Sequence, residues 1–207
     1  MSTAGPTRSV EVEAKVDVEV DTPLLDLTSL PGVVTVGAAE VRSLDARYLD
    51  TARLVLAAHG VALRRRTGGG DAGWHLKGPL VDGGRTEVHW PLGDPNEPPA
   101  GVYDELSRVI AEPLDALGPI ARIRNERTAF VLYSEEGNPI AEFADDHVDA
   151  LDLRTGTERR WREWELELLG GTPSAPPDVL RAFVHVAQAV GAQPAASTSK
   201  LARALGR

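Results

Sequence analysis

The 207-residue chain contains no cysteine, so it can form neither a disulfide framework nor a thiolate metal site. It also has no apolar run long enough to span a bilayer and no signal-peptide core at its start. We therefore expect a cytoplasmic protein that does not bind a membrane. The net charge of −9 argues against a general nucleic-acid surface, because a phosphate backbone requires a basic face. Any polyanion that the chain binds must lie in a local basic pocket.

Lysine is scarce as well. Only three of the 22 basic residues are lysines, namely Lys15, Lys77 and Lys200. Arginine is a different cation rather than a weaker one, so a position that keeps lysine among so many arginines indicates a need for a compact ammonium group. With so few lysines, chance is the alternative interpretation.

The length suits one sizeable hydrophobic core, and the hydrophobic and charged fractions are those of a soluble globular protein. The chain shows no internal repeat. We expect a single domain over residues 1–207, with C-terminal helices within residues 178–205. The run Ser197-Thr198-Ser199 is expected to cap the last of these helices.

Residues 10–20 alternate without a break between apolar and charged side chains, which is the period of a half-buried strand. Valines and Ala14 occupy one face. Glu11, Glu13 and Lys15 lie on the other, where neighbours are about 6.5–7 Å apart. Two carboxylates and an amine on one face can hold a divalent cation and the anion that it bridges. For this stretch alone, an antiparallel strand with its polar side in water is the favoured interpretation, and the rest of the chain reverses that preference.

The other expected strands repeat this division between an apolar face and a strongly charged face, with few uncharged polar residues. The charged positions are Arg64, Arg66, Lys77, Arg85, Glu87, Arg122, Arg124, Glu142, Asp146, Glu163, Glu165 and Glu167. The pattern predicts an α+β protein built on a closed antiparallel β-barrel. Its charged faces would point inward, and its apolar faces outward beneath the helices.

The two kinds of charge belong together chemically. Clustered hard oxygen ligands suit Mg²⁺ or Mn²⁺ rather than zinc, while arginine and lysine suit phosphoryl oxygens. Carboxylates, a divalent metal and basic groups around a phosphate chain are the parts of a phosphoryl-transfer site. Because unpaired buried charges are costly, a wet tunnel with a polyanionic guest is the arrangement we expect.

The run Glu11-x-Glu13-x-Lys15 resembles the ExExK signature of the CYTH superfamily, the triphosphate tunnel metalloenzymes. The resemblance continues in the family's order along nearly the whole chain, through Tyr48-Leu49-Asp50-Thr51, Ala62 to Arg66, Trp74 to Pro79, Arg85-Thr86-Glu87, Arg122-Ile123-Arg124, Ala141-Glu142 with Asp145-Asp146, Glu163 to Glu167, and Ser199-Lys200-Leu201. It implies an eight-stranded antiparallel tunnel that binds triphosphate with a divalent metal.

The resemblance also implies roles for individual residues. Catalytic residues would be Glu11, Glu13, Lys15 and Glu165. Metal ligands would be Glu11, Glu13, Glu142, Asp146, Glu163 and Glu165, and it stays open whether Asp145 or Asp146 faces the tunnel. Substrate would be bound by Lys15, Arg64, Arg66, Lys77, Arg85, Arg122, Arg124 and Lys200.

We therefore expect a Mg²⁺- or Mn²⁺-dependent hydrolase of inorganic triphosphate or short polyphosphate. One alternative is a polyphosphate-binding module without turnover. Another is activity on a different triphosphate, as in a thiamine triphosphatase or an adenylyl cyclase. The end of the chain resembles the junction with a helical CHAD domain, which could follow it in a longer protein. The sequence leaves the oligomeric state open.

Overall fold

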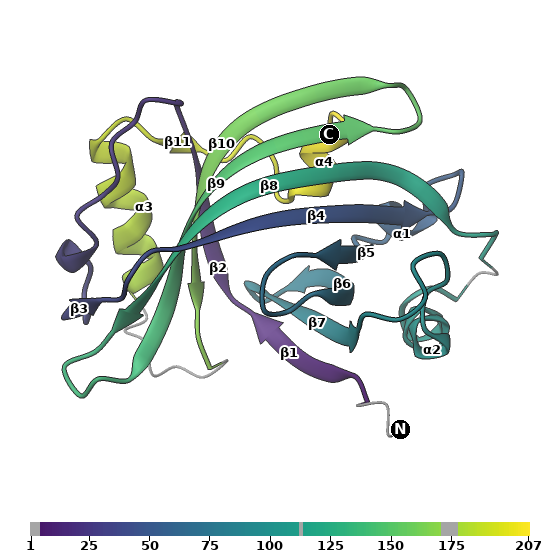
Figure 1. Cartoon of the computed structure of the whole chain (residues 1–207), viewed down its shortest axis with the longest axis horizontal. Helices are drawn as coiled ribbons and strands as arrows, with labels where there is room; N and C mark the ends of the chain where they lie inside the picture. Colours follow the sequence, from purple (N-terminus) through teal and green to yellow (C-terminus); the bar gives the residue numbers. More distant parts are fainter. Residues whose placement is uncertain (1–4, 112–113, 171–177) are drawn as a thin grey trace.

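The computed structural model describes residues 5–111, 114–170 and 178–207. Its elements, coloured along the chain in Figure 1, are β1 (Thr7–Glu11), β2 (Glu13–Val18), the 3₁₀ turn η1 (Leu27–Ser29), β3 (Thr35–Val36), β4 (Glu40–Asp50), α1 (Val55–Ala58), β5 (Ala62–Thr67), β6 (Gly73–Val81), β7 (Gly84–Pro91), α2 (Ala100–Val109), β8 (Gly118–Tyr133), β9 (Pro139–Asp152), β10 (Thr157–Leu168), α3 (Val179–Ala189), β11 (Gln193–Pro194) and α4 (Lys200–Ala204). No helix of the described ranges is long and apolar enough to cross a membrane.

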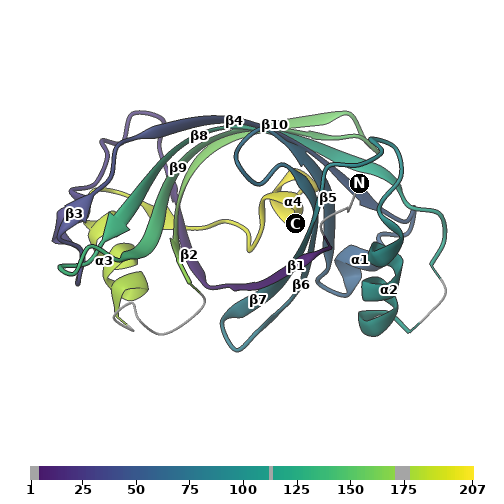
Figure 2. The same cartoon turned by 60° about the horizontal axis from the view of Figure 1, so that its bottom comes forward.

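All the described strands belong to one antiparallel sheet. Its order is β1-β7-β6-β5-β4-β8-β9-β10-β2-β11, with β3 beside β8. The sheet curls until its two ends approach each other, and Figure 2 looks into the resulting ring. The predicted antiparallel tunnel fold is thus confirmed.

No ladder of hydrogen bonds between the described strands closes the ring; the chain itself joins its two sides where β1 continues into β2. The closed barrel that the sequence predicted is therefore wrong in this respect. β1 pairs with β7 and β2 pairs with β10, so the expected unbroken strand over residues 10–20 changes partners at Val12 and ends at Val18. The Val12 carbonyl accepts a hydrogen bond from the Leu168 amide at 2.9 Å. If β1 and β2 are counted as one strand and the two-residue β3 and β11 are set aside, the predicted eight strands remain.

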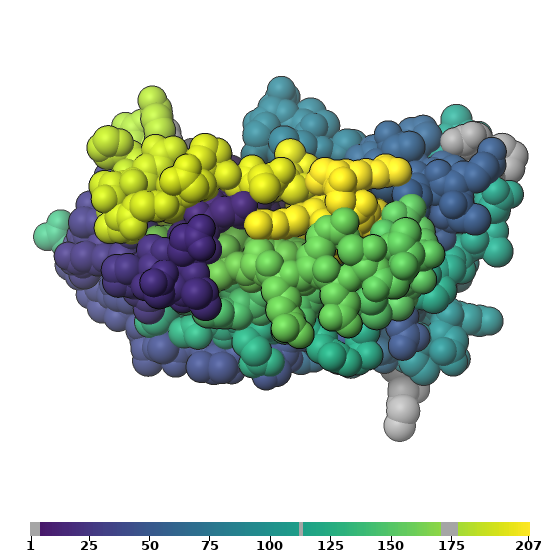
Figure 3. Space-filling view, turned by 90° about the horizontal axis from the view of Figure 1, so that it is seen from above, coloured from purple at the N-terminus to yellow at the C-terminus, as the bar shows by residue number. Residues whose placement is uncertain are grey.

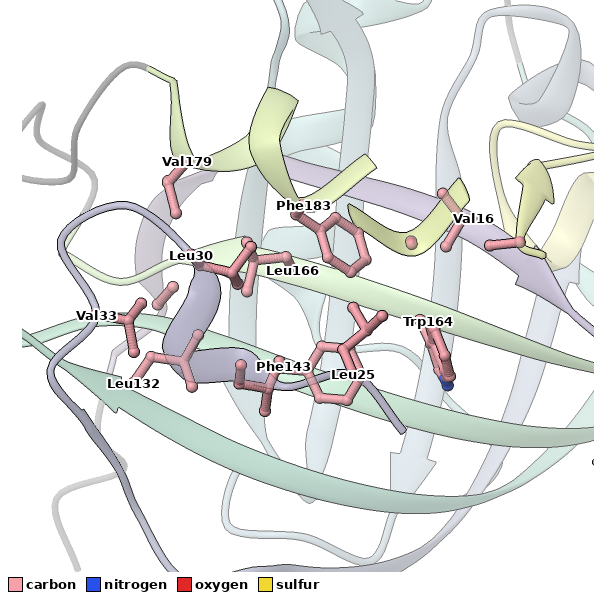
Figure 4. Packing of buried hydrophobic residues seen from close by; sticks show 14 of the residues in the cluster. Val16, Leu25, Leu30, Val33, Leu132, Phe143, Trp164, Leu166, Val179 and Phe183 are labelled. Carbon is pink, nitrogen blue, oxygen red and sulfur yellow. The ribbon is translucent and has the colours of Figure 1, made fainter. Parts of the chain in front are cut away.

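Two apolar cores cover the outside of the ring. At one end, α3 packs Val179 and Phe183 against Phe143 of β9 and Trp164 of β10, as Figure 4 shows. Burial of such side chains gives about 1.5–3 kcal/mol each. At the other end, α1 and α2 cover β5, β6 and β7. These helices take the outer position that the sequence predicted.

The last helix departs from that prediction. Leu201, Ala204 and Leu205 pack against Tyr48 and Ile123, which lie on the inner face of the ring. The C-terminal segment, yellow in Figure 3, lies across this end of the molecule. Helix α4 therefore fills one end of the ring, and the interior is apolar there instead of charged.

Candidate active site

The ring encloses a cavity of about 850 Å³. Within the described residues, carboxylates and cations line it in equal numbers, eight of each. The cations are Lys15, Arg42, Arg64, Arg66, Lys77, Arg85, Arg127 and Lys200, and the acids are Glu11, Glu13, Glu40, Asp71, Glu87, Glu142, Glu165 and Glu167. The strand period explains this: alternate residues of each strand point to the same face.

Three buried carboxylates meet the ammonium of Lys200 in what we call the Lys200 centre, formed by Asp146, Glu163, Glu165 and Lys200. One oxygen from each carboxylate lies within 4.8 Å of the other two. The Lys200 Nζ is 2.8 Å from Asp146 Oδ2, 2.6 Å from Glu163 Oε1 and 2.7 Å from Glu165 Oε1. Three strand residues from β9 and β10 thus surround one cation from α4.

Helix α4 delivers this cation at its first residue. Ser199 caps the helix as predicted, because its side chain accepts a hydrogen bond from the Ala202 amide. The apolar contacts of Leu201 and Ala204 described above then hold the helix in the end of the ring. The position of Lys200 therefore depends on both the cap and the packing.

Every carboxylate oxygen of the Lys200 centre has a positively polarised partner. The Arg127 guanidinium donates to both oxygens of Asp146 and to Glu165 Oε2, each at 2.7 Å. Lys15 donates to Glu165 Oε1 at 2.9 Å, and the Trp161 indole donates to Glu163 Oε2 at 2.5 Å. Glu163 Oε1 has the Lys200 ammonium as its charge partner but accepts no hydrogen bond from a described residue.

These contacts decide the protonation states. Burial opposes ionisation of Glu165, but the charges of Lys15, Lys200 and Arg127 outweigh it and lower the pKa of that carboxyl well below its usual value. Burial also disfavours the Lys200 ammonium, yet Asp146, Glu163 and Glu165 raise its pKa well above normal. Burial raises the pKa of Glu163.

The Lys200 centre can hold a divalent metal by its chemistry, since three hard carboxylate oxygens that nearly converge suit Mg²⁺ or Mn²⁺. The same oxygens are the ones that Lys200 contacts. A metal and the ammonium would therefore compete for them, and metal binding there requires Lys200 to move.

A second group of carboxylates surrounds Lys77, and we call it the Lys77 centre: Glu11, Glu87, Glu167 and Lys77. The Lys77 Nζ donates to both oxygens of Glu11, at 2.8 and 2.6 Å, and lies 3.9 Å from Glu87. Glu87 also contacts Nδ1 of His75 at 2.9 Å, and His75 is only 1% exposed. No sequence pattern indicated a role for this histidine.

In the Lys77 centre, carboxylates outnumber cations, and the pKa values respond. Burial raises the pKa of Glu11 and the neighbouring Glu87 adds to the increase, while the charge of Lys77 opposes it. Burial, followed by the charge of Glu11, raises the pKa of Glu167 to about 7. This carboxyl can therefore gain or lose a proton near neutral pH.

Other predicted residues also lie in the cavity. Glu13 pairs with Lys15 at 3.0 Å, and Arg85 lines the wall. Arg64 donates to the Tyr48 hydroxyl at 3.3 Å. Burial, followed by the charge of Arg64, lowers the pKa of Arg66 to about 10.

The structure does not bring Arg122 and Arg124 into the cavity. On β8 the inward positions are Ile123, Asn125 and Arg127, so Arg122 and Arg124 lie on the outer face. The expectation that both arginines face the tunnel is wrong. The physical reason is that α4 fills the inner face with apolar groups at Ile123, which reverses the expected division of faces on that part of the strand.

Two cations of the cavity, Arg127 and Arg42, were not predicted. Arg42 donates to both oxygens of Glu142, at 2.9 and 3.0 Å, so Glu142 faces the cavity while bound to an arginine. Asp145 contacts Arg162 on the other side of the sheet and Asp146 belongs to the Lys200 centre, which answers the question left open by the sequence. Arg127 lies on the same face of β8 as Ile123 and Asn125, which is the face opposite to the one predicted to point inward.

Sequence relatives match nearly the whole chain. The chain is 37% identical over 212 residues to the Mycobacterium tuberculosis proteins MT2285 and Rv2226, a match that covers 97% of this chain. The chain spans about 41% of the length of these relatives.

Solved structures share the fold. A candidate adenylate cyclase from Bacillus halodurans matches with a TM-score of 0.61 and 17% identity, covering 95% of this chain and 97% of that one. The Hippeastrum protein HpAC1, a candidate adenylyl cyclase described as having a dominant triphosphatase activity, matches with a TM-score of 0.51 and 18% identity, covering 96% of each chain. The family model for the CYTH domain matches residues 9–203, and this chain therefore belongs to the CYTH domain family.

Proposed function

We propose that this protein is a divalent-metal-dependent hydrolase of inorganic triphosphate. The observation that carries the proposal is the cavity of about 850 Å³, whose described lining residues include eight carboxylates and eight cationic side chains. A cavity lined by one sign of charge would suit a simple anion or cation. A lining of both signs suits an anion that arrives with metal ions.

The pairing of these charges supports joint binding of metal and anion. Lys77 is held by Glu11, Arg42 by Glu142, and Lys200 by the carboxylates of its centre. Separating one of these pairs without replacement would leave a charge uncompensated in a partly buried site. A metal that takes the carboxylate and a phosphate that takes the cation replace both partners together.

The roles follow from the two kinds of side chain. Lys15, Arg64, Arg66, Lys77, Arg85 and Lys200, joined by Arg42 and Arg127, would bind phosphoryl oxygens and neutralise the charge that develops on them. Glu11, Glu13, Glu142, Asp146, Glu163 and Glu165 are the proposed metal ligands, of which Glu11, Glu13 and Glu165 together with Lys15 act directly in catalysis. When bound, Mg²⁺ or Mn²⁺ supplies polarisation of a phosphoryl oxygen and orientation of water.

Glu167 adds a group that can exchange protons. Its pKa of about 7 places it between its charged and neutral forms at neutral pH, which is where a general base works best. It lies in the cavity lining beside Glu11 and Glu13. Glu167 is therefore a candidate to accept a proton from attacking water.

The test is phosphate release from tripolyphosphate, ATP, thiamine triphosphate and long-chain polyphosphate, each with Mg²⁺, Mn²⁺ or EDTA. We expect tripolyphosphate with metal to be cleaved fastest, and EDTA to abolish release. Faster release from thiamine triphosphate or from ATP would reassign the substrate. Tight, salt-sensitive tripolyphosphate binding without release from any substrate would mean that the protein is a binding module.

The Glu165→Gln variant sharpens this test, because it keeps the side-chain shape and removes a charged oxygen. We expect turnover to fall about a hundredfold or more, as when a key electrostatic partner of a transition state is lost. Glu158→Gln is the matched control, since Glu158 lies exposed on the same strand. Equal turnover in the two variants, at saturating metal, would contradict a role for the Lys200 centre.

A further inference from the structure

Three arginines lie in a row on the outer face of the sheet, away from the cavity. Arg65 of β5 is directly opposite Arg47 of β4, and Arg47 is directly opposite Arg122 of β8. We call these three residues the outer arginine row. Arg124 lies on the same face, two residues along β8 from Arg122.

This row works against the stability of the sheet unless something neutralises it. Adjacent strands are about 4.8 Å apart, and like charges placed directly opposite each other repel. The chain has a net charge of −9, so a cluster of arginines does not follow from its overall composition. The row therefore needs an anionic partner.

The protein supplies only part of that partner. Asp45 accepts hydrogen bonds from Arg122, at 3.0 Å from Nε and 2.5 Å from the terminal nitrogen. Neither Arg47 nor Arg65 forms an ion pair with any residue that the structure describes. One carboxylate thus balances three guanidinium groups.

The row also borders a small pocket. Its volume is about 120 Å³, and Asp45, Thr67 and Pro95 complete the lining. The Nε of Arg65 is buried, with no hydrogen-bond acceptor among the described residues. Buried donors are nearly always satisfied in native proteins, so an acceptor is missing at this position.

We propose that the outer arginine row binds a small phosphate-class anion, either inorganic phosphate or the terminal group of a short phosphate chain. Guanidinium groups bind phosphoryl oxygens through two parallel hydrogen bonds, and the unsatisfied Arg65 Nε–H is one such donor. The Thr67 hydroxyl borders the same pocket and donates to the Asp45 carbonyl at 3.4 Å. The pocket is smaller than the roughly 300–1,000 Å³ of sites that enclose drug-sized ligands, so it has room for a single phosphoryl group.

This site is separate from the tunnel. Arg64 and Arg66 line the cavity while Arg65 between them lines the outer pocket, because successive residues of a strand point to opposite faces. The proposal does not depend on the proposed hydrolase activity. An anion can bind the outer arginine row whether or not the tunnel cleaves anything.

The experiment follows the arginine side-chain Nε–H signals by NMR during a titration with inorganic phosphate in EDTA, at constant ionic strength maintained with sodium chloride. We expect a saturable shift of the Arg65 signal. Arg47→Gln should weaken phosphate binding tenfold or more, because a hydrogen bond to a charged group is lost. Arg181→Gln is the matched control, because Arg181 is exposed on α3, and this variant should leave phosphate binding unchanged.

Two further arms locate and classify the ligand. Lys77→Ala should leave the Arg65 response intact, and Arg47→Gln should leave tripolyphosphate turnover intact, because each residue belongs to a different site. Acetate tests whether any carboxylate would serve, and diphosphate tests whether a chain end binds as well as free phosphate. Binding of either phosphate form supports the proposal.

Several results would overturn it. One is an Arg65 signal that does not respond to phosphate, or that responds equally to chloride or acetate. Another is unchanged affinity in Arg47→Gln. A response that disappears in Lys77→Ala would place the anion in the tunnel and would refute the outer site.

Discussion

The Lys200 centre and the Lys77 centre use the same residue types but differ in their ratio of carboxylates to cations. Around Lys200, three carboxylates meet Lys200, Lys15 and Arg127. Around Lys77, Glu11 and Glu87 contact one lysine and Glu167 feels its charge, while His75 and Arg64 contact Glu87. Lys200 and Glu165 line the same cavity as the Lys77 centre, with Asp146 and Glu163 buried beside them, and the two groups differ in this ratio.

The difference in ratio changes whether protein cations or protons balance the negative charge of the carboxylates. In the Lys200 centre, protein cations lower the pKa of Asp146 and of Glu165 against the effect of burial. In the Lys77 centre, too few cations are present, so burial raises the pKa of Glu11 and raises that of Glu167 to about 7, where Glu167 is partly protonated at neutral pH. A divalent ion can replace a proton without moving a helix. We therefore expect the Lys77 centre to bind metal first.

The largest expected effect comes from removing Lys200. Lys200→Met leaves three buried carboxylates without their shared cation, and breaking a buried ion pair in this way costs about 3–5 kcal/mol. We expect the free energy of unfolding in EDTA to fall by about that amount, and saturating Mn²⁺ to restore part of it. Urea denaturation with and without Mn²⁺ measures both values.

Lys77→Met is the matched variant in the other centre. Protons already balance part of the charge around Lys77, so its loss of stability should be clearly smaller than that of Lys200→Met. Calorimetric Mn²⁺ titration should also show tighter binding in Lys200→Met than in the wild type. Equal destabilisation of the two variants would contradict the difference between the centres.

The next effect concerns substrate binding. Lys77→Ala should raise KM for tripolyphosphate about tenfold, because a charge-assisted contact of about 1.4 kcal/mol is removed from the ground state as well as the transition state. Arg124→Ala should leave KM unchanged, since Arg124 lies outside the cavity. Steady-state kinetics of the two variants measures this. A raised KM in Arg124→Ala would show that β8 presents its other face to the substrate.

The last expected effect is a pH dependence. The pKa of Glu167 is about 7 in the folded protein, above the ordinary value of 4.5, so the folded state binds the proton more tightly than the unfolded state. This contribution to stability is complete below about pH 4.5 and is lost as pH rises to about 7. In EDTA, the wild type should therefore lose more stability than Glu167→Gln between pH 5 and pH 7.

Between pH 5 and pH 7, His75 has the opposite effect on stability, and comparing the wild type with Glu167→Gln cancels it. Burial lowers the pKa of His75, so His75 makes stability rise with pH. Because His75 is present in both proteins, the difference between their denaturation curves isolates Glu167. Parallel curves for the two proteins would show that Glu167 titrates at its ordinary pKa.

The strand period was enough to predict the fold, because the alternation of residues 10–20 and 163–167 is unambiguous. The break at Val12 could not be predicted, since the alternation continues through it. The break arises because β1 and β2 pair with different strands, β7 and β10. Pairing across such distances in the sequence leaves no local signal.

Where a strand carries its charged residues on only one face, the sequence predicted correctly which side chains enter the cavity, as for Lys77 and Glu165. Strand β8 carries arginine at both parities, at Arg122 and Arg124 and also at Arg127. Only the apolar contacts of α4 with Ile123 decide which parity points inward. That packing is a tertiary contact, and it cannot be predicted from the periodicity of β8.

The apolar plug formed by α4 has a consequence for long substrates. Residues 195–201 line one end of the cavity, and Leu201, Ala204 and Leu205 seal the ring behind them. A linear phosphate polymer cannot thread through a passage that is blocked at one end. Only its terminal units can enter, so cleavage would proceed from the chain ends and each fragment would leave through the mouth by which it came in.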